Sequence, residues 1–218
     1  MTGLLSRRAL IAGSAGLFVA NYSLAQNTQR AATETSRLNV DRFVDDVKRA
    51  RFDSDDQGAV EDVLSRAVSQ PRMVMAGLGE PREAGIHTIY SDADVTILNV
   101  IWAPLMVLLP HNHNMWASIG VYSGREDNII RERSNGVIEA TRAAALSEKE
   151  VFGLSQDAIH SVTNPIGKMT GAIHIYGGNF FAAGRSEWDA ESLRERPFDL
   201  DAAREEFTRA TERYNAVL

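Results

Sequence analysis

The chain has 218 residues, of which 44% are hydrophobic and 24% charged, a balance typical of a soluble globular protein with one sizeable core. Its formal net charge is −6, and no cluster of Lys and Arg occurs after residue 8, so a nucleic-acid-binding or anionic-membrane surface is not expected. The sequence contains no cysteine, which excludes disulfides, thiolate metal sites and a cysteine nucleophile. Any metal must therefore be held by nitrogen or oxygen, and four of the five histidines lie between positions 111 and 174.

Residues 1–25 are expected to be an export signal rather than part of the fold. Arg7 and Arg8 precede an apolar run over 9–20, which is too short to span a bilayer comfortably, and the small residues Ser23 and Ala25 suit signal-peptidase cleavage. The segment around the two arginines resembles a twin-arginine signal, which implies export of the folded protein to the periplasm. An ordinary secretory signal is the alternative. No stable membrane insertion is expected after cleavage.

The mature chain begins with helical patterns. Residues 26–37 are polar and show no periodicity, which indicates a flexible leader. Apolar residues then recur at helical spacing and predict N-terminal helices over 38–70, with Pro71 ending the last of them.

A β-rich region is expected over 71–198. From about residue 73, short apolar runs such as 95–102 alternate with turn signals, among them Ser123-Gly124. Short strands at this spacing, with no helices between them, predict an antiparallel barrel or sandwich. Apolar positions within a charged segment predict a last helix over 199–218, packed outside the barrel.

The histidine pattern is the main functional signal. Residues two apart on a strand point to the same side, so His111 and His113 present both imidazoles to one face of the barrel wall. Two imidazoles are a costly way to fill a core, because each carries a donor and an acceptor that need partners. His160, followed by Asn164 and a proline turn, offers a third imidazole.

These residues resemble the paired metal motifs of the cupin superfamily, in which His-x-His is followed by a turn glycine and later by a further histidine. The resemblance implies a cupin double-stranded β-helix, a jelly-roll barrel, with N-terminal helices and a C-terminal helix. Most metal cupins place a glutamate four or five residues after the second histidine, where this chain has Ala117 and Ser118. That replacement is typical of the cysteine dioxygenase-like (thiol dioxygenase) family, whose three-histidine site binds Fe(II). It implies His111, His113 and His160 as metal ligands.

The same family resemblance implies an activity. An ion held by three neutral ligands has an open face for a substrate thiolate and O2, and the expected reaction oxidises a small thiol to a sulfinate. A His-x-Tyr pair in that family orients substrate and oxygen, and His174 and Tyr176 are similar to it; both are therefore candidate catalytic residues. The family's serine two residues before that histidine is Ala172 here, so a shortened hydrogen-bonded relay is expected.

The substrate is less well defined than the metal. Cysteine-oxidising members carry an arginine that pairs with the substrate carboxylate, and the matching place falls near His87, which cannot form a bidentate fork. His87 and Trp116 are therefore taken as candidate substrate-binding residues, and both thiol and non-thiol substrates remain open. Glu126 and Asp127 follow a turn, and a solvated loop is expected for them instead of a ligand role.

Two other functions are compatible with the sequence. A three-histidine site also suits Zn(II), Ni(II) or Mn(II), and a cupin with one of these metals could be a lyase, isomerase or hydrolase that makes no use of O2. A periplasmic cupin that binds a ligand without turnover is the third possibility. The expected partners are O2 and a small-molecule substrate, with no nucleic acid.

Overall fold

The structure is a computed structural model, and it describes residues 36–54 and 56–217. The predicted export signal over 1–25, and the predicted leader over 26–37 except for its last two residues, lie outside the described residues. Among the helices that are described, none is long and apolar enough to cross a bilayer.

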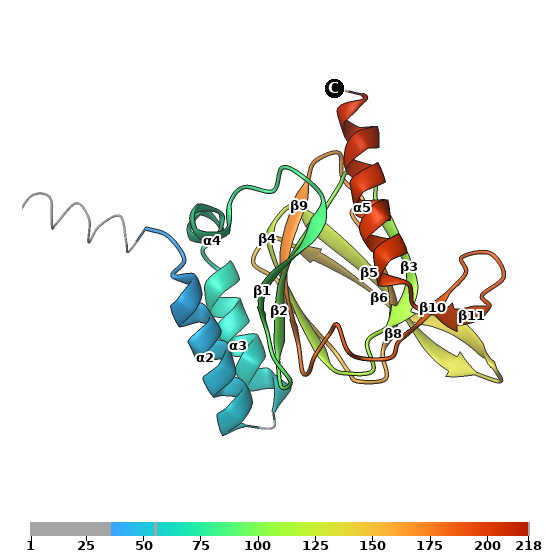
Figure 1. Cartoon of the computed structure of the whole chain (residues 1–218), viewed down its shortest axis with the longest axis horizontal. Coiled ribbons are helices and arrows are strands. Elements are labelled where there is room, and N and C mark those ends of the chain that lie inside the picture. The colour runs from blue at the N-terminus through green and yellow to red at the C-terminus, as the bar shows by residue number, and fades with distance from the viewer. Residues whose placement is uncertain (1–35, 55, 218) are drawn as a thin grey trace, which may run out of the picture. The chain divides into compact units, whose positions relative to one another are not determined.

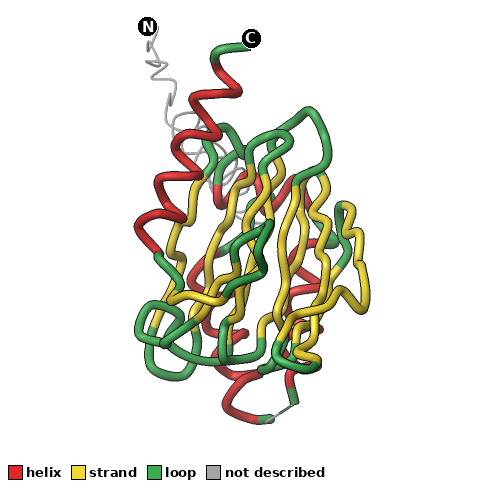
Figure 2. The backbone as a smooth tube through the Cα atoms, turned by 90° about the vertical axis from the view of Figure 1, so that its right-hand side faces the viewer, coloured by secondary structure: helices red, strands yellow, loops and turns green. Residues whose placement is uncertain are grey.

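Two antiparallel β-sheets face each other and form the body of the protein (Figure 2). In the five-stranded sheet the order is β1 (Gly85–Ser91), β2 (Thr96–Trp102), β9 (Thr170–Tyr176), β4 (Ala117–Ser123) and β7 (Val151–Leu154). In the six-stranded sheet the order is β11 (Glu195–Pro197), β10 (Ser186–Trp188), β3 (Val107–Asn112), β8 (Ile159–Thr163), β5 (Arg125–Ser134) and β6 (Val137–Ser147).

The strand pairing identifies the topology. Strands β2 to β9 pair from the ends of this stretch inwards: β2 with β9, β3 with β8, β4 with β7, and β5 with β6. Further pairing of β4 with β9 and of β5 with β8 completes each sheet. The chain therefore forms one long hairpin, rolled up so that successive pairs alternate between the two sheets. This is the eight-stranded jelly roll, or double-stranded β-helix, and it confirms the predicted fold class.

Three helices of the described residues precede the barrel and cover the five-stranded sheet (Figure 1). They are α2 (Val40–Asp53), α3 (Gln57–Val68) and α4 (Pro71–Leu78). Their apolar faces meet the outer face of β2, β4 and β9 in a helix-side core that includes Leu64, Ile97 and Ile175. The predicted start of the barrel at residue 71 is wrong. Pro71 instead occupies the first position of a third helix. The N–H of that position has no partner within a helix, so the N–H that proline lacks costs no hydrogen bond there.

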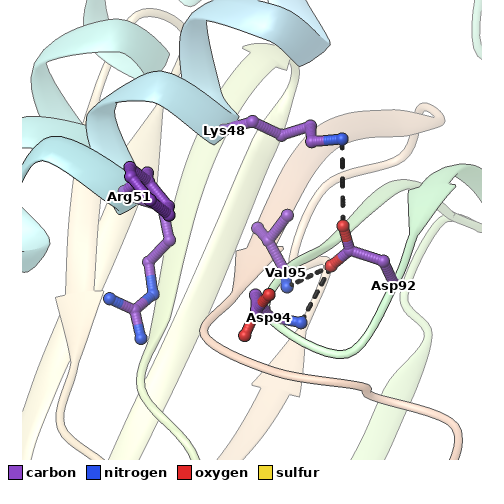
Figure 3. A pocket seen from close by; sticks show the side chains of 6 residues that line it. Lys48, Arg51, Asp92, Asp94 and Val95 are labelled. Atoms are coloured by element: carbon purple, nitrogen blue, oxygen red, sulfur yellow. Dashed lines mark hydrogen bonds and ion pairs between the residues drawn. The ribbon is translucent and has the colours of Figure 1, made fainter.

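The turn between β1 and β2 is fastened to α2 (Figure 3). Lys48 Nζ donates to Tyr90 Oη at 2.7 Å. It also lies 3.9 Å from Asp92 Oδ2, the ion pair drawn in Figure 3. Asp92 Oδ1 accepts from the backbone N–H groups of Asp94 and Val95 at 2.8 and 2.9 Å, which closes the turn. These contacts hold the helices against the β1 edge of the five-stranded sheet. Trp102 and His174 lie on the next two strands of the same sheet, β2 and β9.

The last helix, α5 (Leu200–Asn215), lies at the other side of the barrel from α2 and α3 (Figure 1). Asp199 caps its first turn by accepting from the N–H groups of Asp201 and Ala202. A second core, the interior core, fills the space between the sheets, and the buried Phe207 of α5 belongs to it. The Phe207 ring packs against Trp102, with 5.0 Å between the ring centroids. The C-terminal helix thus forms part of the wall around the barrel interior.

Candidate metal centre

The three predicted ligands come together inside the barrel. His111 lies on β3 opposite His160 on the neighbouring strand β8, and His113 immediately follows β3. One ring nitrogen from each of the three lies within 4.8 Å of the other two. The side chains are 4%, 3% and 1% exposed for His111, His113 and His160, so the cluster is buried. The alternation along one strand and the pairing across to the next strand therefore build the site.

Burial makes these imidazoles neutral. Desolvation lowers the pKa of His111 to about 4. Desolvation, together with the nearby imidazoles, lowers the pKa values of His113 and His160 well below the ordinary histidine range. A neutral imidazole keeps one unprotonated nitrogen, which is the form that binds a metal.

Hydrogen bonds fix which nitrogen is unprotonated in two of the rings. His111 Nδ1 lies 2.9 Å from the carbonyl oxygen of Leu109, and His160 Nδ1 lies 2.7 Å from Oδ1 of Asn128. Both oxygens are acceptors, so each Nδ1 carries the proton and each Nε2 is left with a lone pair.

The spacing of the ring nitrogens fits a bound cation. His113 Nε2 and His160 Nε2 are 2.9 Å apart, close to the roughly 3 Å that separates two nitrogens bound at right angles to one ion at about 2.1 Å. His113 Nδ1 is buried and has no hydrogen-bond partner. Within the described ranges no carboxylate joins the cluster. Ala117 belongs to the interior core, and Ser118 faces α3, where it accepts from Gln57 Nε2.

His174 and Tyr176 lie next to this cluster on β9. Both side chains are buried, and His174 Nδ1 is 3.2 Å from Tyr176 Oη. The Tyr176 ring meets the His113 ring edge-on, with 4.9 Å between centroids. Burial raises the pKa of the Tyr176 hydroxyl, so the phenol stays protonated at physiological pH. The structure therefore brings the predicted His-x-Tyr pair to the predicted ligands.

Glu126 differs from the prediction. It was expected in a solvated loop, but its side chain is completely buried. Oε2 accepts from Trp102 Nε1 at 2.8 Å and from His174 Nε2 at 3.1 Å, while Oε1 accepts from Asn128 Nδ2 at 3.2 Å. The shortened relay expected from Ala172 is also wrong, because this carboxylate holds His174 from another strand.

The turn at Gly124 explains the position of Glu126. Gly124 has φ +83°, which allows a turn tight enough for β5 to begin at the next residue. Alternation along the strand then points Glu126 and Asn128 into the barrel and leaves Asp127 outside, paired with Arg125 at 2.7 Å. The spacing Glu126-x-Asn128 after a glycine turn is the sequence signal that could have revealed this.

Arg185 is a site residue that sequence reasoning missed. It lies in the connection between β9 and β10, and its guanidinium lies over the rings of Phe180 and Phe198, at 3.9 and 4.4 Å from their centroids. Its Nη1 is buried without a hydrogen-bond partner, and no carboxylate among the described residues forms an ion pair with it. Arg185 lines the same cavity as the three histidines and Tyr176. The position is set by packing against two rings rather than by any sequence motif.

The two predicted substrate-binding residues lie elsewhere. His87 is exposed, because alternation along β1 points its neighbour Ile86 into the cavity and His87 away from it. Trp116 packs against Gly177 and the helix-side core. Neither side chain lines the cavity at the histidines, so both predictions are corrected. That cavity is small, about 30 Å³, which is room for about one water-sized group, and most of its lining is apolar.

Comparison with known proteins adds context to the fold. No protein-family profile matches the chain. The chain is similar to an RmlC-like cupin family protein with a double-stranded β-helix fold from Methanocaldococcus jannaschii, with 8% identity and a TM-score of 0.39 over 46% of this chain and 84% of that one. It is similar to a double-stranded β-helix protein from Klebsiella pneumoniae, with 11% identity and a TM-score of 0.36 over 55% of this chain and 88% of that one.

An oxalate oxidase is also similar, with 15% identity and a TM-score of 0.37 over 45% of this chain and 53% of that chain, so the match spans about half of the oxidase. The fold assignment rests on the strand order and pairing given above. Together, fold and site define a double-stranded β-helix protein with a buried three-histidine cluster that can hold a metal ion.

Proposed function

We propose that this protein is an Fe(II)-dependent dioxygenase that oxidises a small thiol to a sulfinate. The observation that carries the proposal is the composition of the site: three buried, neutral histidines beside a His–Tyr pair and a buried arginine. Among residues 36–54 and 56–217, no carboxylate joins the three histidines and none forms an ion pair with the arginine. Fe(II) bound there would supply open positions at which a thiolate and O2 meet. In the overall reaction, R–SH and O2 give R–SO2H. Both oxygen atoms join the sulfur, which loses four electrons to them.

Arg185 gives the site a recognition element. A guanidinium binds a carboxylate through two parallel hydrogen bonds, and the two rings that contact it hold this one in place. Its buried Nη1 lacks the acceptor that a carboxylate oxygen would provide. We therefore propose a small thiol that carries a carboxylate, such as 3-mercaptopropionate or cysteine, whose entry requires the side chains around the cavity of about 30 Å³ to move apart.

Tyr176 and the apolar lining have separate tasks in this proposal. The phenol lies against His113, and its raised pKa keeps the hydroxyl proton in place, so the group orients the reactants by hydrogen bonding rather than as an anion. His174 positions the hydroxyl through its Nδ1. The apolar residues around the cluster exclude bulk water, which strengthens hydrogen bonds and charge interactions at the site.

The test is metal analysis combined with oxygen uptake. Protein purified without added metal is assayed for iron, zinc, nickel and manganese, loaded with Fe(II) without oxygen, and then given O2 with a panel of thiols. We expect one O2 consumed per thiol and both atoms of isotopically labelled O2 in the sulfinate. If the iron-loaded protein consumes no O2 with any thiol, the oxygenase proposal is wrong. Turnover with Zn(II), Ni(II) or Mn(II) and no O2 would then indicate a lyase, isomerase or hydrolase, and ligand binding without turnover would indicate a binding protein.

We also propose that the protein acts in the periplasm after twin-arginine export, on the basis of residues 1–25. Replacing Arg7 and Arg8 together by lysine keeps the charge and removes the motif. Cell fractionation should then show the full-length precursor retained in the cytoplasm. Continued export of this variant would indicate an ordinary secretory signal.

A further inference from the structure

Glu126 is the junction of two hydrogen-bond paths. One path runs from its Oε2 through His174 to Tyr176, and the other from its Oε1 through Asn128 to His160. All these groups are buried, so water does not compete for their hydrogen bonds. The Glu126 carboxylate accepts one hydrogen bond from each of three donors: an indole, an imidazole and an amide.

The amide of Asn128 transmits this preference to the cluster. Because Glu126 accepts, Asn128 must turn its NH2 group toward Glu126 and its Oδ1 toward His160. An amide oxygen cannot donate, so His160 must carry its proton on Nδ1. Its Nε2, which is 2.9 Å from His113 Nε2, then keeps the lone pair that a metal needs.

We propose that Glu126 is a positioning residue that sets the tautomer of His160 through Asn128, and thereby the metal affinity of the three-histidine cluster. This inference rests on the metal site within the proposed function and is independent of the reaction performed there. It assigns a role to a carboxylate that is not part of the ligand cluster and that belongs to a different strand from every ligand.

The consequence of removing the charge can be followed atom by atom. In Glu126→Gln, an amide NH2 replaces one carboxylate oxygen. If it replaces Oε1, it faces the NH2 of Asn128, and Asn128 must turn over to avoid two opposed donors. The NH2 of Asn128 would then point at His160 Nδ1, which would have to accept and leave the proton on Nε2, where it blocks the metal. If the new NH2 replaces Oε2, it faces two donors, the indole N–H and the His174 N–H. This orientation is less favourable than the first, in which it faces one donor.

A second substitution should reverse the effect. In the double variant Glu126→Gln, Asn128→Asp, the new Gln NH2 donates to the new carboxylate. The other oxygen of that carboxylate accepts from His160 Nδ1, so the original tautomer returns. The indole and His174 still find an amide oxygen at position 126. The double variant has the same total charge as the wild type, because one carboxylate is removed at position 126 and one is added at position 128.

The experiment is a Co(II) titration of the full chain, followed by its visible absorption, for the wild type, Glu126→Gln and the double variant. The dissociation constant should rise about 10- to 100-fold in Glu126→Gln, the usual effect of losing a partner of a metal-bound histidine. It should return to within about threefold of the wild type in the double variant. The matched control is Asp127→Asn, which removes one carboxylate from the outer face of the same strand and should leave the affinity unchanged.

A second measurement does not depend on any variant. Nitrogen-15 NMR of the wild-type chain, with and without Zn(II), should show His160 protonated at Nδ1 in both states. Protonation at Nε2 in the metal-free chain would overturn the inference even if Glu126→Gln failed to fold. So would an unchanged Co(II) affinity in folded Glu126→Gln, or a folded double variant no tighter than the single one. The oxygenase function would be refuted if the wild type bound Co(II) as expected but its iron-loaded form consumed no O2 with any thiol. That result would leave this inference standing.

Discussion

Replacing Arg185 by methionine removes a buried cation while keeping the length of the side chain. If Arg185 binds a substrate carboxylate, the variant loses two charge-assisted hydrogen bonds, each worth about 1.5–3 kcal/mol. Water already hydrogen-bonds the carboxylate of the free substrate, so only part of this energy contributes to binding. We therefore expect a net loss of about 3 kcal/mol, or roughly 10²-fold in kcat/KM. The fold should change little, because Nη1 of Arg185 has no hydrogen-bond partner to lose and the methionine side chain can keep apolar contact with Phe180 and Phe198.

The assay compares two substrates that differ only in charge: 3-mercaptopropionate and its methyl ester. Oxygen uptake by the iron-loaded wild type should favour the acid by roughly 10²-fold, and Arg185→Met should lose most of that preference. Arg185→Lys restores the charge but not the planar fork, so an intermediate preference is expected. A variant that still prefers the acid as strongly as the wild type would refute the role given to Arg185, as would a wild type that does not discriminate.

Three further predictions concern the site. His113→Ala should abolish stoichiometric metal binding, measured by metal analysis, and retention of one metal per chain would show that the ligand assignment is wrong. Tyr176→Phe should keep the metal and slow oxygen uptake by about 10- to 100-fold, whereas loss of metal would show that the phenol acts on the ligands. In the metal-free protein, the pKa of His111 is lowered from 6.5 to about 4, so the unfolded chain binds more protons between these values and stability falls as the pH drops through that range. The loss from His111 alone is about 3 kcal/mol, and denaturant titrations should show a shallower pH dependence in His111→Gln.

Regular alternation explains what the sequence could predict. Short strands between turn signals predicted an antiparallel barrel or sandwich, and the resemblance of the histidine motifs to metal cupins implied the jelly roll. The two-residue period predicted that His111 and His113 share a face, and the same resemblance added His160, which the structure places opposite His111. The same period places His174 and Tyr176 on one face of β9. These are local properties that survive folding unchanged.

The errors arose where a local signal allowed two outcomes. Pro71 both ends one helix and begins the next, so α4 was missed. Gly124 was interpreted as the start of a loop, although a single residue at positive φ is enough to reverse the chain, and Glu126 was therefore placed in solvent. Arg185 lies in a connection without periodicity, and only the packing of Phe180 and Phe198, from either side of it in sequence, brings it to the histidines.

The nested pairing of strands has a consequence for when the site can exist. Thr96 pairs with Tyr176 and His111 with His160, so the contacts that close the barrel join residues far apart in the sequence, a topology associated with slow folding. Before β3 meets β8, only His111 and His113 are near each other, and a pair of imidazoles on a loose strand discriminates little between metals. The complete three-histidine site therefore exists only after barrel closure. A metal that needs all three imidazoles is drawn from a compartment in which the chain is already folded.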